Sequence, residues 1–218
     1  MAFVHLRSHT EFSVVDGTVR IDDLVKAAAK DGQPAVAVTD LSNLFGAVKL
    51  YSAARKKGVQ PIIGADVWIE PEESGKTPTR LLLLIQNRQG YLRLCELLGE
   101  AWTAPGQRSH AWVHWASLAA NNAGLICLSG ADLGSIGQAL INGDAAKAEA
   151  QATRLAETFP GRFYIELQRA GHPTNETHIR GAVPLAAKLG LPVVATHPIQ
   201  FSTPDDFEAH EARTCIAE

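Results

Sequence analysis

The sequence predicts an α/β fold built on a largely parallel sheet, either closed into a barrel or left open and doubly wound. Short apolar runs that suit buried strands alternate about seven times with stretches of helical periodicity. Such alternation favours parallel strands joined by right-handed crossovers. Polar residues directly follow several predicted strands, as at the active face of a barrel; they are His9, Asp40, Ser129, Arg169 and His197.

Length, composition and charge limit the possible functions. With 218 residues the chain can bury a substantial core as one barrel or two small domains, and its 46% hydrophobic residues suit a globular protein. No apolar run reaches the roughly 18 residues of a bilayer-spanning helix, and the start MAFVHLRS lacks a signal-peptide pattern. We therefore expect a cytoplasmic protein with no membrane partner. A net charge of −3 argues against nonspecific nucleic-acid binding as the main task.

The opening stretch, FVHLRSHTEFSVVDG at residues 3–17, is the strongest functional signal. A strand predicted over 3–6 runs into Arg7, His9, Glu11 and Asp16, whose side chains can ligate metal, carry protons or bind phosphate. Ligands of α/β folds usually lie at this end of a strand. The stretch therefore predicts one edge of a site.

Two elements follow the opening stretch by ordinary rules of helix and strand formation. Apolar residues at helical spacing predict a helix over 21–30, which Gly32 suits as a C-terminal stop. A mostly β-branched run predicts a buried strand over 35–38, ending in Thr39 and Asp40. Asp40 is thus a second carboxylate at the exit of a strand.

A further helix is predicted from about 44 to 57. Asn43 is expected to cap its start, and Gly58 to close it. Three cations, Arg55, Lys56 and Lys57, fall in its last turn, where they complement the helix dipole. This role is favoured over a DNA-binding patch.

The rest of the chain repeats the alternation. Strands are predicted over 61–69, 81–85, 125–128, 163–167 and 192–196, and helices over 89–102, 145–159, 174–189 and from 203 or 204 to 216. Loops are expected over 70–79 and 103–114, with Trp112 and Trp115 packing the second one down. Asp66 is the only charged residue within its predicted strand, so we expect its carboxylate to have a partner in the fold. The three cysteines, Cys95, Cys127 and Cys215, lie far apart in apolar patterns and are expected to be buried reduced thiols.

Four stretches carry a resemblance to a known family: FVHLRSHTEFSVVDG, AVAVTDLSNLFGAVKLYSAARKKGVQPIIGADVWI, YIELQRAGHP and LPVVATHPIQFSTPDDFEAHE. Together they resemble the polymerase and histidinol phosphatase (PHP) domain at the N-terminus of bacterial DNA polymerase III alpha subunits, the replicative polymerases. The resemblance covers essentially the whole chain. It implies a distorted (βα)7, TIM-like barrel, the PHP fold. It also implies that residues 1–218 are a single PHP domain and a fragment of a much longer polymerase chain.

Metal-binding members of this family hold two or three divalent ions that activate water for phosphoester hydrolysis. The resemblance places surviving ligand positions at His9, Asp16 and Asp66, with Asp40 nearby, and Asp66 stands where the family has Glu. The remaining positions are substituted or flank the substitutions: Arg7 in HxH, Leu41 in TDHG, Arg169 and Ala170 in QDHG, Pro198 and Gln200 in DxH, and His197 beside them. The pattern is that of a degenerate metal site.

Three scattered ligands suit one weakly held Mn, Zn or Mg ion at most, and a two-metal centre is not expected. Arg7 and Arg169 would place positive charge where ions would otherwise sit, so pairing of arginine with aspartate is the simplest account of the site. For His9 and Asp16 we favour a hydrogen-bonded pair over catalysis. No cofactor is expected in this domain, and the Mg of the polymerase reaction would belong to a polymerase domain absent from the sequence.

We therefore expect a non-catalytic scaffold that docks the proofreading exonuclease (epsilon-type) subunit. It would also contact the remainder of the polymerase chain, and DNA only through the whole holoenzyme. The alternative is a residual metal-dependent phosphoesterase, pyrophosphatase or proofreading nuclease resting on His9, Asp16, Asp40 and Asp66. A freestanding histidinol phosphatase ranks last because it needs the missing histidines.

Overall fold

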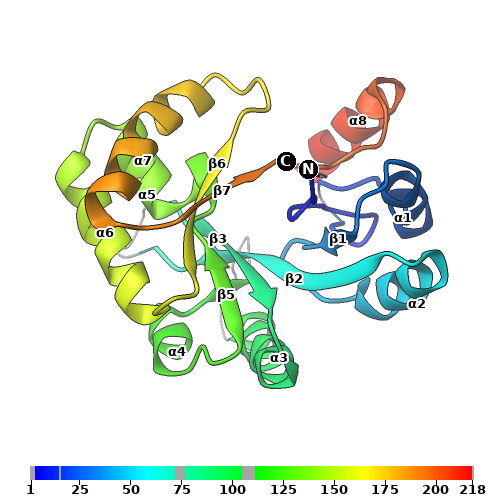
Figure 1. The fold of residues 1–218 in the computed structure, drawn as a ribbon, viewed down its shortest axis with the longest axis horizontal. Coiled ribbons are helices and arrows are strands. Elements are labelled where there is room, and N and C mark those ends of the chain that lie inside the picture. The colour runs from blue at the N-terminus through cyan, green and yellow to red at the C-terminus, as the bar shows by residue number, and fades with distance from the viewer. Residues whose placement is uncertain (1–2, 15, 72–76, 105–110, 218) are drawn as a thin grey trace. The chain divides into compact units, whose positions relative to one another are not determined.

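The computed structural model describes residues 3–14, 16–71, 77–104 and 111–217. The chain divides into two compact units, which are described separately (Figure 1). The first unit comprises Met1–Asp66 and His197–Glu218, and the second comprises Val67–Thr196. Strand β2 (Gln60–Ile69) passes from the first unit into the second. Among the described residues, no helix is both long enough and apolar enough to cross a bilayer.

The first unit is built on a short parallel pairing of two strands. Strand β1 (Ala35–Val38) pairs with the start of β2, from Ala35 opposite Gln60 to Val38 opposite Ile63. Helices α1 (Ile21–Lys30) and α2 (Ala47–Lys57) pack against each other. A 3₁₀ turn (Pro204–Asp206) leads into α8 (Phe207–Ala217). The unit has its own apolar core: Val19, Ile21, Leu24, Val25, Ala28, Val36, Val38, Leu50, Ala54 and Val59.

The second unit holds the remaining strands in the order β2-β3-β5-β6-β7, with β4 also paired to β2. Its strands are β3 (Thr79–Ile85), β4 (Trp112–Val113), β5 (Leu125–Leu128), β6 (Phe163–Gln168) and β7 (Val193–Thr196). Its helices are α3 (Arg88–Thr103), α4 (Trp115–Ala120), α5 (Ser135–Ile141), α6 (Ala145–Thr158) and α7 (Asn175–Leu189), with a 3₁₀ turn at Ala131–Leu133. Helices α5, α6 and α7 pack together (Figure 1).

Two strand predictions need correction. The segment at 3–6 forms no regular strand; instead the opening segment makes isolated bridges, Ser8 with Ile199 and Thr10 with Val19. Strand β3 runs antiparallel to β5, from Leu82 opposite Leu128 to Ile85 opposite Leu125. Only nine residues, 70–78, connect β2 to β3, and a crossover to a parallel neighbour needs about a dozen or more. The favoured parallel direction therefore fails at β3.

Smaller differences concern loops, a cap and thiols. The 103–114 loop contains β4, while its residues 105–110, including His110, and residues 72–76 of the other predicted loop lie outside the described residues. Helix α2 starts three residues later than expected, because Asn43 accepts from the backbone N–H of Phe45 and fixes a turn there. Cys127 is buried as predicted, but Cys95 and Cys215 are exposed, so that prediction was wrong for both.

We expect the buried His178 of the second unit to make the fold less stable in acid. His178 on α7 is 0% exposed, and neither ring nitrogen has a hydrogen-bond partner among the described residues. Burial lowers the pKa of His178, against the opposing charges of Asp132 and Glu166. Below pH 6.5 His178 therefore becomes protonated in the unfolded chain but stays neutral in the folded unit. The free energy of unfolding consequently falls as the pH falls.

We expect His178→Leu to lose less stability than the unsubstituted protein when the pH drops from about 7.5 to about 5. Urea unfolding followed by tryptophan fluorescence reports on this unit, because Trp68, Trp102, Trp112 and Trp115 all lie in it. Equal acid sensitivity of the two proteins would contradict the assignment to His178.

Candidate functional site

The backbone of the first unit brings the predicted site residues together. The opening segment lies beside β1, with the Ala37 N–H donating to the His5 carbonyl at 2.8 Å and the Thr39 N–H donating to the Ser8 carbonyl at 3.0 Å. Side chains two residues apart on an extended segment point the same way. Arg7 and His9 consequently face the same neighbours.

A buried ion pair joins the opening segment to β2. The Arg7 guanidinium donates to Oδ2 of Asp66, and these residues are 4% and 0% exposed. The Nε2 of His9 lies 3.2 Å from the same oxygen. The lone charge inside β2 is thus explained by two basic partners. The expected pairing of an arginine with an aspartate is present here.

His9 bridges two carboxylates. Its Nδ1 lies 2.9 Å from Oδ1 of Asp16, which is the pair favoured from the sequence, while its Nε2 faces Asp66. Burial by itself lowers the pKa of His9, but the hydrogen bonds and charges of Asp16 and Asp66 outweigh it and raise the pKa to about 9. At neutral pH both ring nitrogens therefore carry protons and donate.

Asp40 anchors the turn that follows the opening segment. Its carboxylate accepts from the Thr10 N–H at 2.6 Å, from the Thr10 hydroxyl at 2.9 Å and from the Ser13 hydroxyl at 2.8 Å. Burial raises the pKa of Asp40, and these hydrogen bonds partly oppose it. Asp40 holds the chain that carries Asp16, rather than capping the next helix.

Four of the substituted or flanking positions belong to the first unit: Leu41, His197, Pro198 and Gln200. Leu41 is bridged to Asp66 in the backbone pairing, so an apolar side chain stands beside the buried carboxylate. Gln200 donates from its amide to Asp16 at 3.5 Å. The ring of His197 stacks edge-on against His5 at 6.4 Å. Pro198 precedes Ile199, whose backbone pairs with Ser8.

Arg169 and Ala170 belong to the second unit and have local partners there. The Arg169 guanidinium donates to Glu176 at 2.6 Å and is 71% exposed. The Ala170 N–H donates to the Asn175 side chain at 2.9 Å. The structure therefore gives Arg169 a solvent-exposed glutamate, where the sequence suggested a site aspartate.

The sequence of this chain matches a known protein family and is similar to known proteins. The model of the PHP domain family matches residues 5–170, which is more than half of the chain. The chain belongs to the PHP domain family. DNA polymerase III subunit alpha of Pseudomonas aeruginosa is 48% identical over 221 residues, covering 100% of this chain and 19% of the relative. That of Escherichia coli K12 is 40% identical over 214 residues, covering 98% and 18%.

This PHP domain therefore spans about a fifth of the length of the curated relatives that it matches. Among solved structures, it is similar to an amidohydrolase from Chromobacterium violaceum with bound sulfate. The TM-score is 0.65 at 15% identity, and 96% of each chain is covered. The likeness confirms the predicted fold class.

The donor set does not fit the two- or three-ion centre of metal-binding PHP domains. Within the described ranges, no three His, Cys, Asp or Glu side chains form a group that could hold a metal ion. The Arg7 guanidinium already donates to the Asp66 carboxylate. His9 is protonated on both ring nitrogens, so it offers no lone pair to a metal ion. Arg7 and protonated His9 place two positive charges beside Asp16 and Asp66, so both carboxylates have cationic partners without a metal ion.

Freeing His9 for a metal at pH 7 would first cost the removal of its proton. With the pKa of His9 at about 9, that step costs about 3 kcal/mol before any bond to an ion forms. A divalent ion at Asp66 would also have to displace the Arg7 guanidinium, or lie against it. Both effects oppose metal binding.

Three buried polar residues were missed from the sequence. Thr10 and Ser13 fix Asp40, and no motif marks them. Glu166 in β6 is 0% exposed and accepts from the Thr196 hydroxyl at 2.6 Å and the Gly130 N–H at 3.1 Å. A charge inside an apolar strand was the available signal for Glu166, as it was for Asp66.

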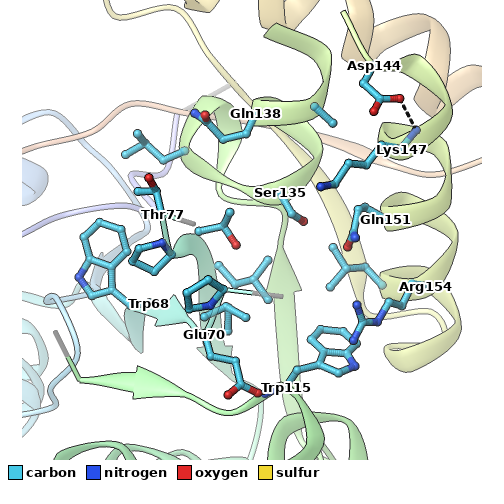
Figure 2. Close-up of a pocket in the computed structure, with 18 of the residues that line it drawn as sticks. Trp68, Glu70, Thr77, Trp115, Ser135, Gln138, Asp144, Lys147, Gln151 and Arg154 are labelled. Carbon is cyan, nitrogen blue, oxygen red and sulfur yellow. Dashed lines mark hydrogen bonds between the residues drawn. The ribbon is translucent and has the colours of Figure 1, made fainter. Parts of the chain in front are cut away.

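The second unit also contains a cavity of about 1180 Å³, which none of the predicted site residues lines (Figure 2). Lys147, Gln151 and Arg154 project from α6 at helical spacing along one wall. The Arg154 guanidinium stacks over Trp115 at 4.0 Å, and Glu70 accepts from the Trp115 N–H at 2.9 Å. These two contacts link Arg154, Trp115 and Glu70 in the cavity wall.

Proposed function

We propose that this chain is the PHP domain of a replicative DNA polymerase III alpha subunit and acts there as a non-catalytic scaffold. The observation that carries the proposal is the internally neutralised cluster of Arg7, His9, Asp16 and Asp66. Its charges stabilise the fold of the first unit, and they leave no lone pair on His9 for a metal. Similarity to the polymerase subunits supports the larger context.

In this proposal the scaffold has two protein partners. One is the remainder of the polymerase chain, which supplies the DNA-directed nucleotidyl transfer and its magnesium. The other is the proofreading exonuclease (epsilon-type) subunit, which docks on this domain. DNA would be reached through the whole holoenzyme. The net charge of −3 is consistent with contacts to protein in preference to DNA.

The direct test is a binding titration of the full-length polymerase subunit with the purified exonuclease subunit. We expect a complex whose affinity drops when residues 1–218 are removed. Undiminished affinity without these residues would rule out the docking role.

The alternative is residual metal-dependent phosphoesterase, pyrophosphatase or nuclease activity. It is kept because His9, Asp16 and Asp66 do converge in the first unit. We expect no turnover of p-nitrophenyl phosphate or pyrophosphate above the blank with added Mn²⁺ or Zn²⁺. Turnover that disappears in Asp16→Ala, but persists in the remote control Asp144→Ala, would favour this alternative.

A further inference from the structure

One face of the first unit carries large apolar side chains that no described residue covers. Phe45 lies in the turn before α2, and Val48 and Tyr51 follow at spacings of three on the helix. They are 70%, 77% and 54% exposed. A neighbouring side of α2 is buried through Ala47, Leu50 and Ala54, and α2 packs on α1. The exposed residues are therefore not needed for the core of the unit.

Positive charge gathers at the C-terminal end of α2. Arg55, Lys56 and Lys57 form the last turn of α2 and are exposed. Arg55 stands seven residues after Val48, so these two side chains share one side of the helix. Lys56 and Lys57 turn away from that side and spread the positive charge around the end of the helix. We call the set Phe45, Val48, Tyr51, Arg55, Lys56 and Lys57 the α2 surface.

Among the described residues, the cations of the α2 surface have no acidic partner. No ion pair joins Arg55, Lys56 or Lys57 to another residue in the described ranges. Lys49, on the same helix, differs because it pairs with Glu11 at 2.7 Å. The helix dipole favours cations at this end by a modest amount. The guanidinium and ammonium groups remain exposed to solvent, so a partner can still bind them.

Apolar and cationic residues in this order fit a protein segment better than a nucleic acid. Binding along a single strand combines stacked bases with cations spread along the backbone path. Here the cations gather at one end, and an aliphatic residue, Val48, lies between the two aromatic rings. An amphipathic helix presents apolar residues at matching three- and four-residue spacings.

We propose that the α2 surface docks an acidic amphipathic helix of a partner protein. The partner's apolar residues would pack on Phe45, Val48 and Tyr51, and its carboxylates would lie at the cationic end of α2, with Arg55 next to the apolar residues. The assignment rests on the proposed scaffold function and gives the exonuclease subunit its contact surface. Complementary charge would steer the two proteins together and set the orientation of the helix.

The experiment measures the affinity of the purified exonuclease subunit for the full-length polymerase subunit and its variants. Val48→Asp places a charge in the centre of the apolar face and should weaken binding about tenfold or more. Arg55→Glu with Lys56→Glu should weaken binding several-fold at low salt, and less at about 0.5 M salt, where charges are screened. Both changes lie on exposed positions, and circular dichroism checks that folding is unchanged.

Two matched controls separate this surface from general effects. Trp102→Ser removes a large side chain that is 62% exposed on α3 of the second unit. Lys30→Glu reverses an exposed cation in the last turn of α1. Both controls should bind like the unsubstituted protein. If Val48→Asp also does so, the α2 surface is not the docking site, although the scaffold function stands.

Two other outcomes also overturn the inference. Absence of any complex with the unsubstituted protein would remove the scaffold function together with its contact surface. If Val48→Asp keeps the exonuclease complex but weakens binding of an oligo(dT) strand, the surface serves nucleic acid. Loss of affinity in both α2 variants, with both controls intact, supports the proposal.

Discussion

Asp66→Ala is expected to destabilise the first unit by about 3–5 kcal/mol. The substitution removes a carboxylate to which the buried Arg7 guanidinium donates, and one of the two carboxylates that His9 contacts. Breaking a buried ion pair by deleting one member costs this much because the other charge stays desolvated. Hydrogen exchange of the α1 amides is the suitable measurement, since all four tryptophans report on the second unit.

Two variants sharpen this test. Arg7→Met combined with Asp66→Leu removes both charges and should cost clearly less than Asp66→Ala alone. Glu11→Gln breaks the partly exposed pair with Lys49 and should cost less than about 1 kcal/mol. If Asp66→Ala were as mild as Glu11→Gln, the ion pair could not be what holds the cluster together.

The second large effect is a loss of stability in mild alkali. Asp16 and Asp66 raise the pKa of His9 to about 9 in the folded state, against burial, and the ordinary value is 6.5. Below pH 6.5 His9 is protonated in both states, and its contribution is fully present. Between pH 6.5 and about 9 the unfolded chain loses the proton first, so stability falls by about 3 kcal/mol in all.

The measurement is the protection of the α1 amides at a series of pH values, in the protein and in His9→Gln. The variant should be less stable at pH 6 and should lack this alkaline decline. His114→Gln, which alters a half-exposed histidine bonded to Glu70 in the second unit, should keep it. A decline of equal size in His9→Gln would assign the effect to another group.

The sequence predicted a helix or its end well where a single local signal, such as apolar spacing or a C-terminal glycine, determines it. The helix over 21–30 was found to the residue, because its apolar spacing has no competitor, and Gly58 ends α2 with a φ of 71°, as a C-terminal glycine should. The reversed direction of β3 was missed, although the 70–79 connection showed no helical pattern. A connection without a helix should have predicted a reversal at that point.

Within the site, the sequence predicted the pairs that the charge pattern demands. A lone Asp66 in an apolar strand needs a cation, and Arg7 stands at a former ligand position. The role of Asp40 was not predictable, since it depends on the hydroxyls of Thr10 and Ser13, which come together only after folding. Arg169 could not be placed either, because its choice of Glu176 rests on the local path of the chain.

The most direct test of the account is the titration of His9 by NMR in the 218-residue protein, with and without zinc. An internally neutralised cluster predicts an imidazole pKa near 9, unchanged by a slight molar excess of Zn²⁺ at pH 7.5. A resident metal site predicts the opposite behaviour. A His9 imidazole that loses its proton below pH 7, or that shifts with one equivalent of Zn²⁺, would contradict the account.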